Sequence, residues 1–261
     1  MGVLLVALLD DQEARARIAD AMRGHAELRC FGRLRDAERE LARGAAHAVF
    51  VTPTDESGTP VLPLIRRLRR GQSAIPIAVY APLTPEAAVE VVALARAGID
   101  EVILRGHDDL GVSLRALLSR AGSARAATEA YRVLSGAVPS PATSILAYCL
   151  EHAQDSLTVG ALADALGVHR KTLLNRLAAG ALPPPSALIS WCRLFIAARL
   201  LEDGRRTVEQ VALALGFGSG TALRNMFRRY TGLRPAEIRR RGGLTCVATV
   251  FRGRAVIPPA W

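Results

Sequence analysis

The sequence of 261 residues predicts two domains of different class, an α/β domain built on a doubly wound parallel sheet and then an all-helical domain. Through roughly the first 120 residues, short apolar runs alternate with amphipathic helical stretches, as expected of a parallel sheet covered by helices on both faces. A segment rich in Ala, Ser, Gly and Pro follows from Ala121 to Ser144, and beyond it the periodicity is helical.

Five strands and five helices are expected in the first domain. The expected strands are Val3–Leu9, Leu28–Phe31, Ala48–Val51, Ile75–Tyr80 and Glu101–Leu104. The expected helices are Glu13–Arg23, Arg35–Arg43, Val61–Arg70, Pro85–Ala97 and Leu110–Arg120. Because no basic segment precedes the first apolar run and acids follow it, this run is expected to be a buried strand rather than a signal peptide.

Changes in composition and periodicity set the expected domain limits. Residues 1–122 form the α/β domain, residues 123–143 an interdomain linker with a short helix around Ala126–Leu134, and residues 144–243 the helical domain.

The remaining residues, 244–261, carry strand-forming stretches at Thr245–Phe251 and Ala255–Ile257. They predict a β-rich tail that forms a hairpin or covers a sheet edge. A role of this tail in interdomain docking or dimerisation is a hypothesis.

Positive charge is concentrated in the C-terminal half. Of the net charge of +10, residues 140–261 contribute 16 Arg and Lys against 7 Asp and Glu, whereas the other 139 residues hold 18 against 17. This distribution is expected when only the C-terminal half meets a polyanion. Lys171 is the only lysine; arginine suits bidentate contacts to phosphate and guanine, although genomic base composition is an alternative explanation for the bias.

Several other classes of protein are disfavoured. The four cysteines (Cys30, Cys149, Cys192, Cys246) are scattered without a C-x-x-C pair, so neither a zinc site nor a disulfide framework is expected and a reducing cytoplasm is the expected location. An alkyl-transfer DNA repair enzyme would need a reactive cysteine beside metal-ligating or His partners, so no catalytic residue, metal or cofactor is expected. No apolar run approaches the ~20 residues that cross a bilayer, so no membrane partner is expected.

The stretch from Thr207 to Ile238 predicts a helix-turn-helix. Thr207 and Gln210 have the spacing of a capping box, and apolar residues at helical spacing follow. Gly216 ends this helix, and a second helix follows with Leu223, Phe227 and Met226 inward and several Arg and Asn residues outward.

A second pair of helices precedes it at Val159–Leu166 and His169–Ala178, separated by a turn at Gly167. Leu173, Leu174 and Leu177 are expected to face inward. Between the two pairs, Pro185–Asp203 predicts one long helix. Its expected apolar stripe is Trp191, Leu194, Ala197, Ala198 and Leu201.

These motifs together resemble the DNA-binding module of the AraC/XylS transcription regulators. The string A-x-x-x-GF-x-S followed by F-x-R-x-x-G-x-x-P occupies Ala212 to Pro235, and ALADALGVHRKTLLNRL resembles the first motif of that module. The connecting helix carries part of the family pattern at Arg193 and Arg199, but PPPS replaces the usual entry to that helix. A rigid spacer of this kind lets both recognition helices enter successive major-groove segments, ~34 Å apart.

The outward residues of the two recognition helices are the expected DNA contacts. They are His169, Arg170, Lys171, Thr172 and Arg176 in the first motif, and Ser219, Thr221, Arg224, Asn225, Arg228 and Arg229 in the second. Arg can pair with guanine and Asn with adenine, whereas Arg176, Arg228 and Arg229 are expected to hold phosphate. Gly220 offers no side chain at the start of its helix, so the second motif is expected to depend more on backbone contacts.

The first domain resembles a response-regulator receiver, a flavodoxin-like fold, and its departures from that family matter. An acidic pair follows the first strand at Asp10 and Asp11, and Gly98 matches the segment entering the last strand. Where the resemblance places the phosphoacceptor Asp, the sequence has Thr52. Ala81 replaces the hydroxyl residue, Val102 the aromatic switch residue, and Arg105-Gly106 the Lys-Pro pair.

Phosphotransfer needs a carboxylate nucleophile, a metal held by acids and a cation for the phosphoryl oxygens. Thr52 lacks the first, so we predict a receiver-like domain that does not accept phosphate. Asp55 is the one nearby carboxylate that could replace the acceptor, and Asp10 and Asp11 are more readily explained as capping or surface acids without a metal.

The sequence thus favours a sequence-specific, DNA-binding transcription regulator. Its receiver-like domain would serve dimerisation, giving a homodimer, or signal input through binding of RNA polymerase, another protein or a small ligand. The alternative is a phosphorylation-controlled response regulator that uses Asp55.

Overall fold

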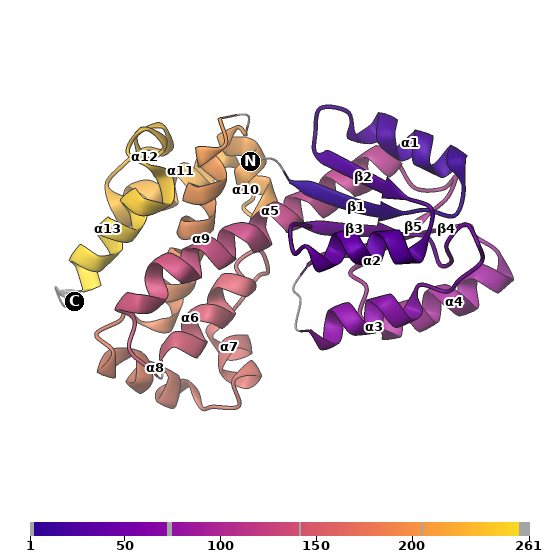
Figure 1. Cartoon of the computed structure of the whole chain (residues 1–261). Coiled ribbons are helices and arrows are strands. Elements are labelled where there is room, and N and C mark those ends of the chain that lie inside the picture. The colour runs from indigo at the N-terminus through magenta and orange to yellow at the C-terminus, as the bar shows by residue number, and fades with distance from the viewer. Residues whose placement is uncertain (1–2, 72–74, 141, 205, 256–261) are drawn as a thin grey trace. The chain divides into compact units, whose positions relative to one another are not determined.

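The computed structural model describes residues 3–71, 75–140, 142–204 and 206–255, and the chain divides into two compact units, Met1–Gly122 and Ser123–Trp261 (Figure 1). The N-terminal unit contains a parallel sheet of five strands in the order β2-β1-β3-β4-β5. The strands are β1 (Leu4–Leu8), β2 (Glu27–Phe31), β3 (Ala48–Val51), β4 (Ile77–Ala81) and β5 (Glu101–Leu104). This is the strand order of a flavodoxin-like doubly wound sheet, which confirms the predicted fold class.

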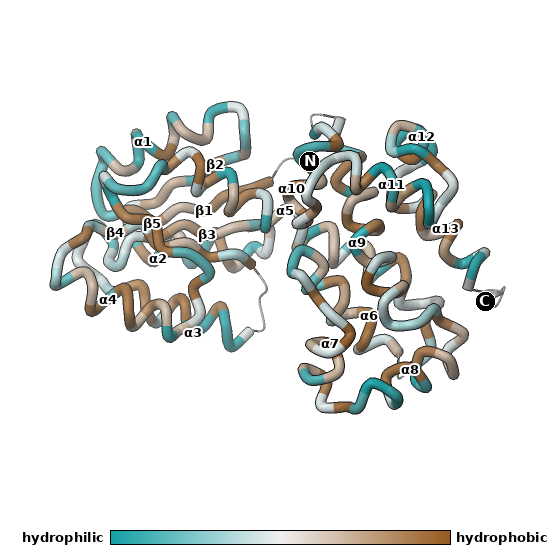
Figure 2. The backbone as a smooth tube through the Cα atoms, turned by 180° about the vertical axis from the view of Figure 1, so that it is seen from behind, coloured by the Kyte–Doolittle hydropathy of each residue, from teal (hydrophilic) through white to brown (hydrophobic). Residues whose placement is uncertain are grey.

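Helices cover both faces of this sheet. They are α1 (Gln12–Met22), α2 (Leu34–Ala42), α3 (Leu62–Arg70), α4 (Pro85–Arg96) and the beginning of α5 (Leu110–Leu134). Because side chains alternate along a strand, Leu5 and Ala7 of β1 pack with α1 and α5, whereas Leu8 packs with the helices of the other face. Strands β1, β3 and β4 are buried throughout and strongly hydrophobic (Figure 2), as expected of strands covered on both faces.

The C-terminal unit is helical and is organised around one long helix, α9 (Pro185–Glu202). The other helices are α6 (Ala142–Glu151), α7 (Val159–Ala165), α8 (Arg170–Ala179), α10 (Val208–Ala214), α11 (Gly220–Thr231), α12 (Pro235–Arg240) and α13 (Gly243–Ala255). Helix α9 contacts α6, α8, α10, α11, α12 and α13. The whole predicted apolar stripe of α9, from Trp191 to Leu201, is buried, which confirms the predicted long helix and its inward face.

The segment predicted as a linker, residues 123–143, is more ordered than expected. Helix α5 continues through it as far as Leu134, and a short 3-10 turn, Ser135–Ala137, follows. Ala126, Ala130 and Leu134 recur every fourth residue and are buried in the core of the C-terminal unit. The short helix expected around Ala126–Leu134 is therefore present as the end of α5. Alanine, which has the highest helix propensity, supplies much of its buried face.

The predicted β-rich tail is wrong for the residues that the structure describes, because residues 243–255 form helix α13. Leu244, Val247, Ala248 and Phe251 follow helical spacing and are buried against the core. Packing against α9 overrides the modest strand preference of the β-branched residues. The end of the predicted strand Ala255–Ile257 lies outside the described residues.

Within the described ranges, no helix is both long enough and apolar enough to cross a membrane.

Candidate nucleic-acid interface

Helices α10 and α11 form the second predicted motif, and a side chain caps each of them. Thr207 Oγ1 accepts a hydrogen bond from the Gln210 backbone N–H at 3.1 Å, and Gln210 Oε1 accepts one from the Thr207 N–H at 2.9 Å. This reciprocal pair confirms the predicted capping box. Between the helices, Gly216 has a φ of 66°, a left-handed conformation that glycine adopts without steric cost.

Arg193 of α9 holds this turn in place. Its Nη2 donates to the Leu215 carbonyl oxygen at 2.6 Å, and its guanidinium lies over the Phe217 ring, 3.9 Å from the centroid. Burial lowers the pKa of Arg193, but an arginine stays charged at neutral pH. The family pattern pointed to Arg193, but only the structure identifies its partners. Arg193 therefore attaches the second motif to the central helix.

The expected DNA contacts of the second motif fall into two groups. Ser219 caps α11, because its Oγ accepts from the Ala222 N–H at 3.2 Å, and is half-buried. The other side chains are exposed on α11: Thr221, Arg224, Asn225, Arg228 and Arg229.

The first motif, α7 and α8, has the same organisation. Thr158 caps α7, and His169 caps α8 through an Nδ1 that accepts from the Lys171 N–H at 3.3 Å. The exposed residues on α8 are Arg170, Lys171, Thr172, Asn175 and Arg176. Leu174, which was expected to face inward, is 46% exposed, because Leu173 and Leu177 alone fill the buried face of α8.

The cations on these two helices have no carboxylate partner within the part of the chain that the structure describes. Among the described residues no ion pair with a carboxylate forms at Arg170, Lys171, Arg176, Arg224, Arg228 or Arg229. In the N-terminal unit, by contrast, many arginines are paired, including Arg15, Arg29, Arg67, Arg105 and Arg120. Exposed guanidinium groups without carboxylate partners are available to phosphates.

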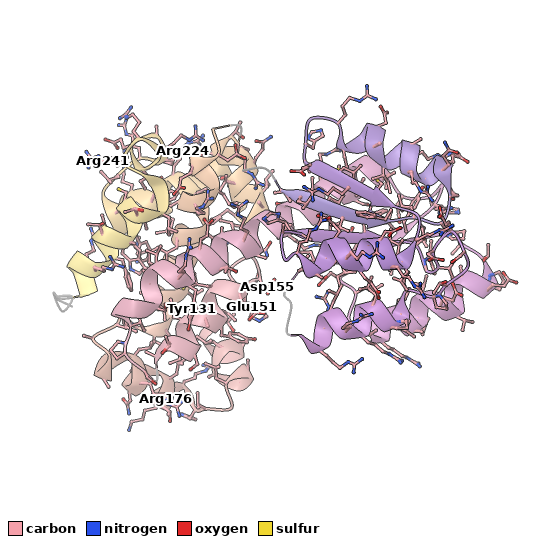
Figure 3. The ribbon with its side chains drawn as sticks, viewed as in Figure 1. Tyr131, Glu151, Asp155, Arg176, Arg224 and Arg241 are labelled. Carbon is pink, nitrogen blue, oxygen red and sulfur yellow. The ribbon has the colours of Figure 1, made fainter. Side chains whose placement is uncertain are left out.

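The two basic helices are well separated within the helical unit. Arg176 of α8 and Arg224 of α11 lie at opposite ends of it (Figure 3). The intervening helix α9 has 18 residues, which corresponds to a length of ~27 Å at 1.5 Å per residue. This length is comparable with the ~34 Å between successive major-groove segments.

In the N-terminal unit, the acidic pair after β1 is bound by an arginine. Arg105 Nη1 donates to Asp11 Oδ2 at 2.6 Å, its Nη2 forms an ion pair with Asp10, and its guanidinium lies 4.9 Å from the centroid of the Tyr80 ring. Asp11 also accepts from the Ala14 N–H at 2.6 Å and so caps α1. That backbone bond, followed by Arg105, holds the pKa of Asp11 below its usual range. Capping, expected for this pair, is confirmed for Asp11.

The residues at the expected phosphoacceptor and hydroxyl positions are fully buried. Thr52 Oγ1 donates to the Thr54 carbonyl oxygen at 2.7 Å, and Ala81 ends β4 with no exposed surface. Neither residue offers a carboxylate to a phosphoryl donor.

Asp55 is a structural carboxylate. Its Oδ1 accepts from the N–H and Oγ of Ser57 and from the Thr59 N–H, its Oδ2 accepts from the Leu34 N–H at 2.9 Å, and the residue is only 4% exposed. Burial alone raises the pKa of this carboxyl, but the hydrogen bonds from Ser57, Leu34 and Thr59 outweigh burial and hold the pKa well below its usual range.

Two of the thiols are buried in the helical core. Cys149 and Cys192 have no exposed surface, and burial followed by contact with Cys149 raises the pKa of the Cys192 thiol well above its usual value. A buried thiol with a raised pKa is a poor nucleophile.

Comparison with known proteins locates one family match in the C-terminal unit and finds relatives over part of the chain. Residues 162–241 match the family described as a helix-turn-helix domain. A putative AraC-like transcription regulator of Streptomyces lividans is 36% identical over 85 residues, which is 33% of this chain and 28% of that protein. One from Streptomyces antibioticus is 31% identical over 107 residues, 41% of this chain and 35% of that protein. The matched part of the chain therefore spans about a third of the length of these relatives.

Among solved structures, a putative response regulator from Chloroflexus aurantiacus J-10-fl has 17% identity and a TM-score of 0.41, covering 46% of this chain and 99% of that one. The fold class of the N-terminal unit rests on its own strand order, which is receiver-like. Residues 162–241 of the C-terminal unit thus match a helix-turn-helix domain, and part of the chain is similar to regulators described as AraC-like.

Proposed function

We propose that this chain is a sequence-specific, DNA-binding transcription regulator. The observation that carries the proposal is the set of exposed cations on α8 and α11 that have no carboxylate partner in the described part of the chain. A polyanion supplies the missing counterions, and helix-turn-helix recognition helices are the elements that insert into the major groove.

The exposed side chains divide by role. Base edges are contacted by residues near the beginnings of the two recognition helices. These are Arg170, Lys171 and Thr172 on α8, and Thr221, Arg224 and Asn225 on α11. Arg176, Arg228 and Arg229 lie further along the helices and bind phosphates, which fixes register without reading sequence. His169 and Ser219 already accept backbone hydrogen bonds, so they position the helices rather than select bases.

We further propose that the receiver-like domain acts without phosphorylation, in dimerisation or in binding RNA polymerase, another protein or a small ligand. Three features support this: Arg105 forms ion pairs with both Asp10 and Asp11, Thr52 stands where an acceptor carboxylate is expected, and both oxygens of Asp55 accept hydrogen bonds. Receipt of a phosphoryl group at Asp55 would require breaking those bonds.

The DNA-binding proposal is tested by selecting bound sequences from a pool of random duplexes with the full chain, followed by footprinting. We expect two protected segments with centres about 10 base pairs apart and affinity for the selected duplex that exceeds random DNA by roughly 1,000-fold or more. Equal affinity for selected and random duplexes would refute sequence-specific recognition. A single protected segment would refute recognition by both helices.

A further inference from the structure

The two helix-turn-helix motifs can be compared position by position. In each, the first helix follows a threonine cap, Thr158 or Thr207, and the recognition helix follows its own cap, His169 or Ser219. Gly160 and Glu209 are therefore both the second residue of a first helix. Arg170 and Gly220 are likewise both the first residue of a recognition helix.

At these equivalent positions a glycine and a charged residue occur in opposite order. The first motif has Gly160 on the first helix and Arg170 on the recognition helix, whereas the second has Glu209 and then Gly220. A Cβ built on Gly160 would lie 2.6 Å from Arg170 Nη2, so the arginine side chain crosses the space above that glycine. A Cβ built on Gly220 would lie 2.3 Å from Glu209 Oε2. In the first motif the recognition helix supplies the long side chain, whereas in the second the preceding helix supplies it.

The Glu209 carboxylate is held at the beginning of α11. Its Oε2 accepts a hydrogen bond from the Gly220 N–H at 2.8 Å, and Gly220 is buried beneath it while Glu209 remains exposed. Ser219 already caps this helix, and in the described part of the chain Glu209 has no cationic partner. The missing side chain at Gly220 is thus replaced by a carboxylate from α10.

Equivalent points of the two motifs therefore carry opposite charges. The N-terminal end of a recognition helix is where base edges are usually reached. Arg170 can bind phosphate or guanine there, but a carboxylate repels phosphate and accepts hydrogen bonds from the amino group of cytosine.

We propose that Glu209 is a specificity-determining residue of the second motif, selecting a cytosine at the base pair beneath the beginning of α11. This inference rests on the proposed DNA-binding function. It differs from the expectation, based on Gly220 alone, that this motif depends mainly on backbone contacts.

The test uses the full chain and compares base preference at each position of the selected site, affinity for random duplex DNA, and thermal unfolding. Glu209→Gln keeps an oxygen that can accept from the Gly220 N–H but removes the charge. We expect it to reduce the preference for cytosine at one base pair by roughly 5- to 150-fold and to bind random DNA a few-fold more tightly at low salt.

Two further variants separate the causes. Gly220→Ala moves the carboxylate without changing the charge, so it should lose the same base preference without the gain in random binding. Asp164→Asn removes one exposed acid from α7 of the first motif, and it should leave the cytosine preference unchanged.

An unchanged preference at every base pair in Glu209→Gln would overturn the inference. So would a uniform loss of affinity accompanied by a lower unfolding temperature, which would make Glu209 a helix cap only. If the unaltered chain selects no sequence, the proposed function fails first, and that outcome is distinct from both of these.

Discussion

Replacing Arg193 with alanine tests how the second recognition helix is held. The change removes the hydrogen bond to the Leu215 carbonyl oxygen and the contact with the Phe217 ring. Both partners belong to the turn between α10 and α11, so the loss acts on the placement of α11 and not on its exposed face.

The magnitude follows from these contacts. A hydrogen bond from a charged donor contributes ~1.5–3 kcal/mol, and a partly desolvated cation–π contact adds ~0.5–2 kcal/mol. Removing the half-buried guanidinium also relieves its desolvation cost, and its Nε has no partner among the described residues. We therefore expect the free energy of unfolding to fall by about 2 kcal/mol.

Stability is measured by urea unfolding followed by tryptophan fluorescence. Trp191 lies in the core of α9, and replacing Trp261 with phenylalanine in every variant makes Trp191 the only reporter. DNA binding is measured by footprinting on the selected duplex. We expect protection to weaken at the half-site bound by α11 while protection at the half-site bound by α8 persists.

Arg199→Ala is the matched control. Arg199 lies on the same helix and pairs with Glu129 and Glu202 instead of the second motif. It should lower stability without a preference for either half-site. Equal weakening of both half-sites in Arg193→Ala, or unchanged protection at both, would refute the assigned role of Arg193.

Arg224→Ala should cost ~1–3 kcal/mol of DNA-binding free energy and relax one base position, and unchanged affinity and preference in binding assays would exclude Arg224 from recognition. Incubation with acetyl phosphate and magnesium should add no phosphoryl mass, whereas a stable adduct on Asp55 would contradict the proposed phosphorylation independence. Phe251→Ala should destabilise the helical unit by ~3–5 kcal/mol, because Phe251 packs edge-on against Trp191 and Phe195. Thr249 is exposed on the same helix, so the control Thr249→Ala should change the midpoint of urea unfolding little. Equal midpoints for the two variants would argue against packing of α13 on α9. Asp55→Asn should lower the free energy of unfolding by ~2 kcal/mol at neutral pH. Because the pKa of Asp55 is depressed in the folded protein, the stability that its carboxylate contributes is complete above the unfolded carboxyl pKa of ~3.9 and is lost as pH falls below it. A stability difference from the parent protein that grows below pH ~4 would contradict this assignment.

Local patterns predicted most of the elements correctly. The capping box at Thr207, the buried strand Ala48–Val51 and the apolar stripe of α9 depend on residues close in sequence. Such short-range signals are readable from one chain because capping and burial periodicity are set within a few turns or residues.

Composition was a weaker guide where packing decided the outcome. The β-branched stretch from Thr245 onward was predicted as strand and is helix α13. The short helix predicted around Ala126–Leu134 is present, but as the end of the long helix α5 and not as part of a linker. In both places the apolar residues recur at helical spacing and contribute to the core. Strand propensity differs among residues by only ~1 kcal/mol, which burial of a single large side chain exceeds.

The sequence by itself determined the fold class, the two helix pairs α7–α8 and α10–α11, and which residues of α8 and α11 face outward, apart from Leu174. Only the tertiary structure decided that Arg105 binds Asp10 and Asp11, that Arg193 holds the Leu215 turn, and that Glu209 covers Gly220. Each of these contacts joins residues on different elements. Which residues become partners depends on which elements pack together in the buried core. A sequence pattern within one element does not specify that packing, so it cannot predict these contacts.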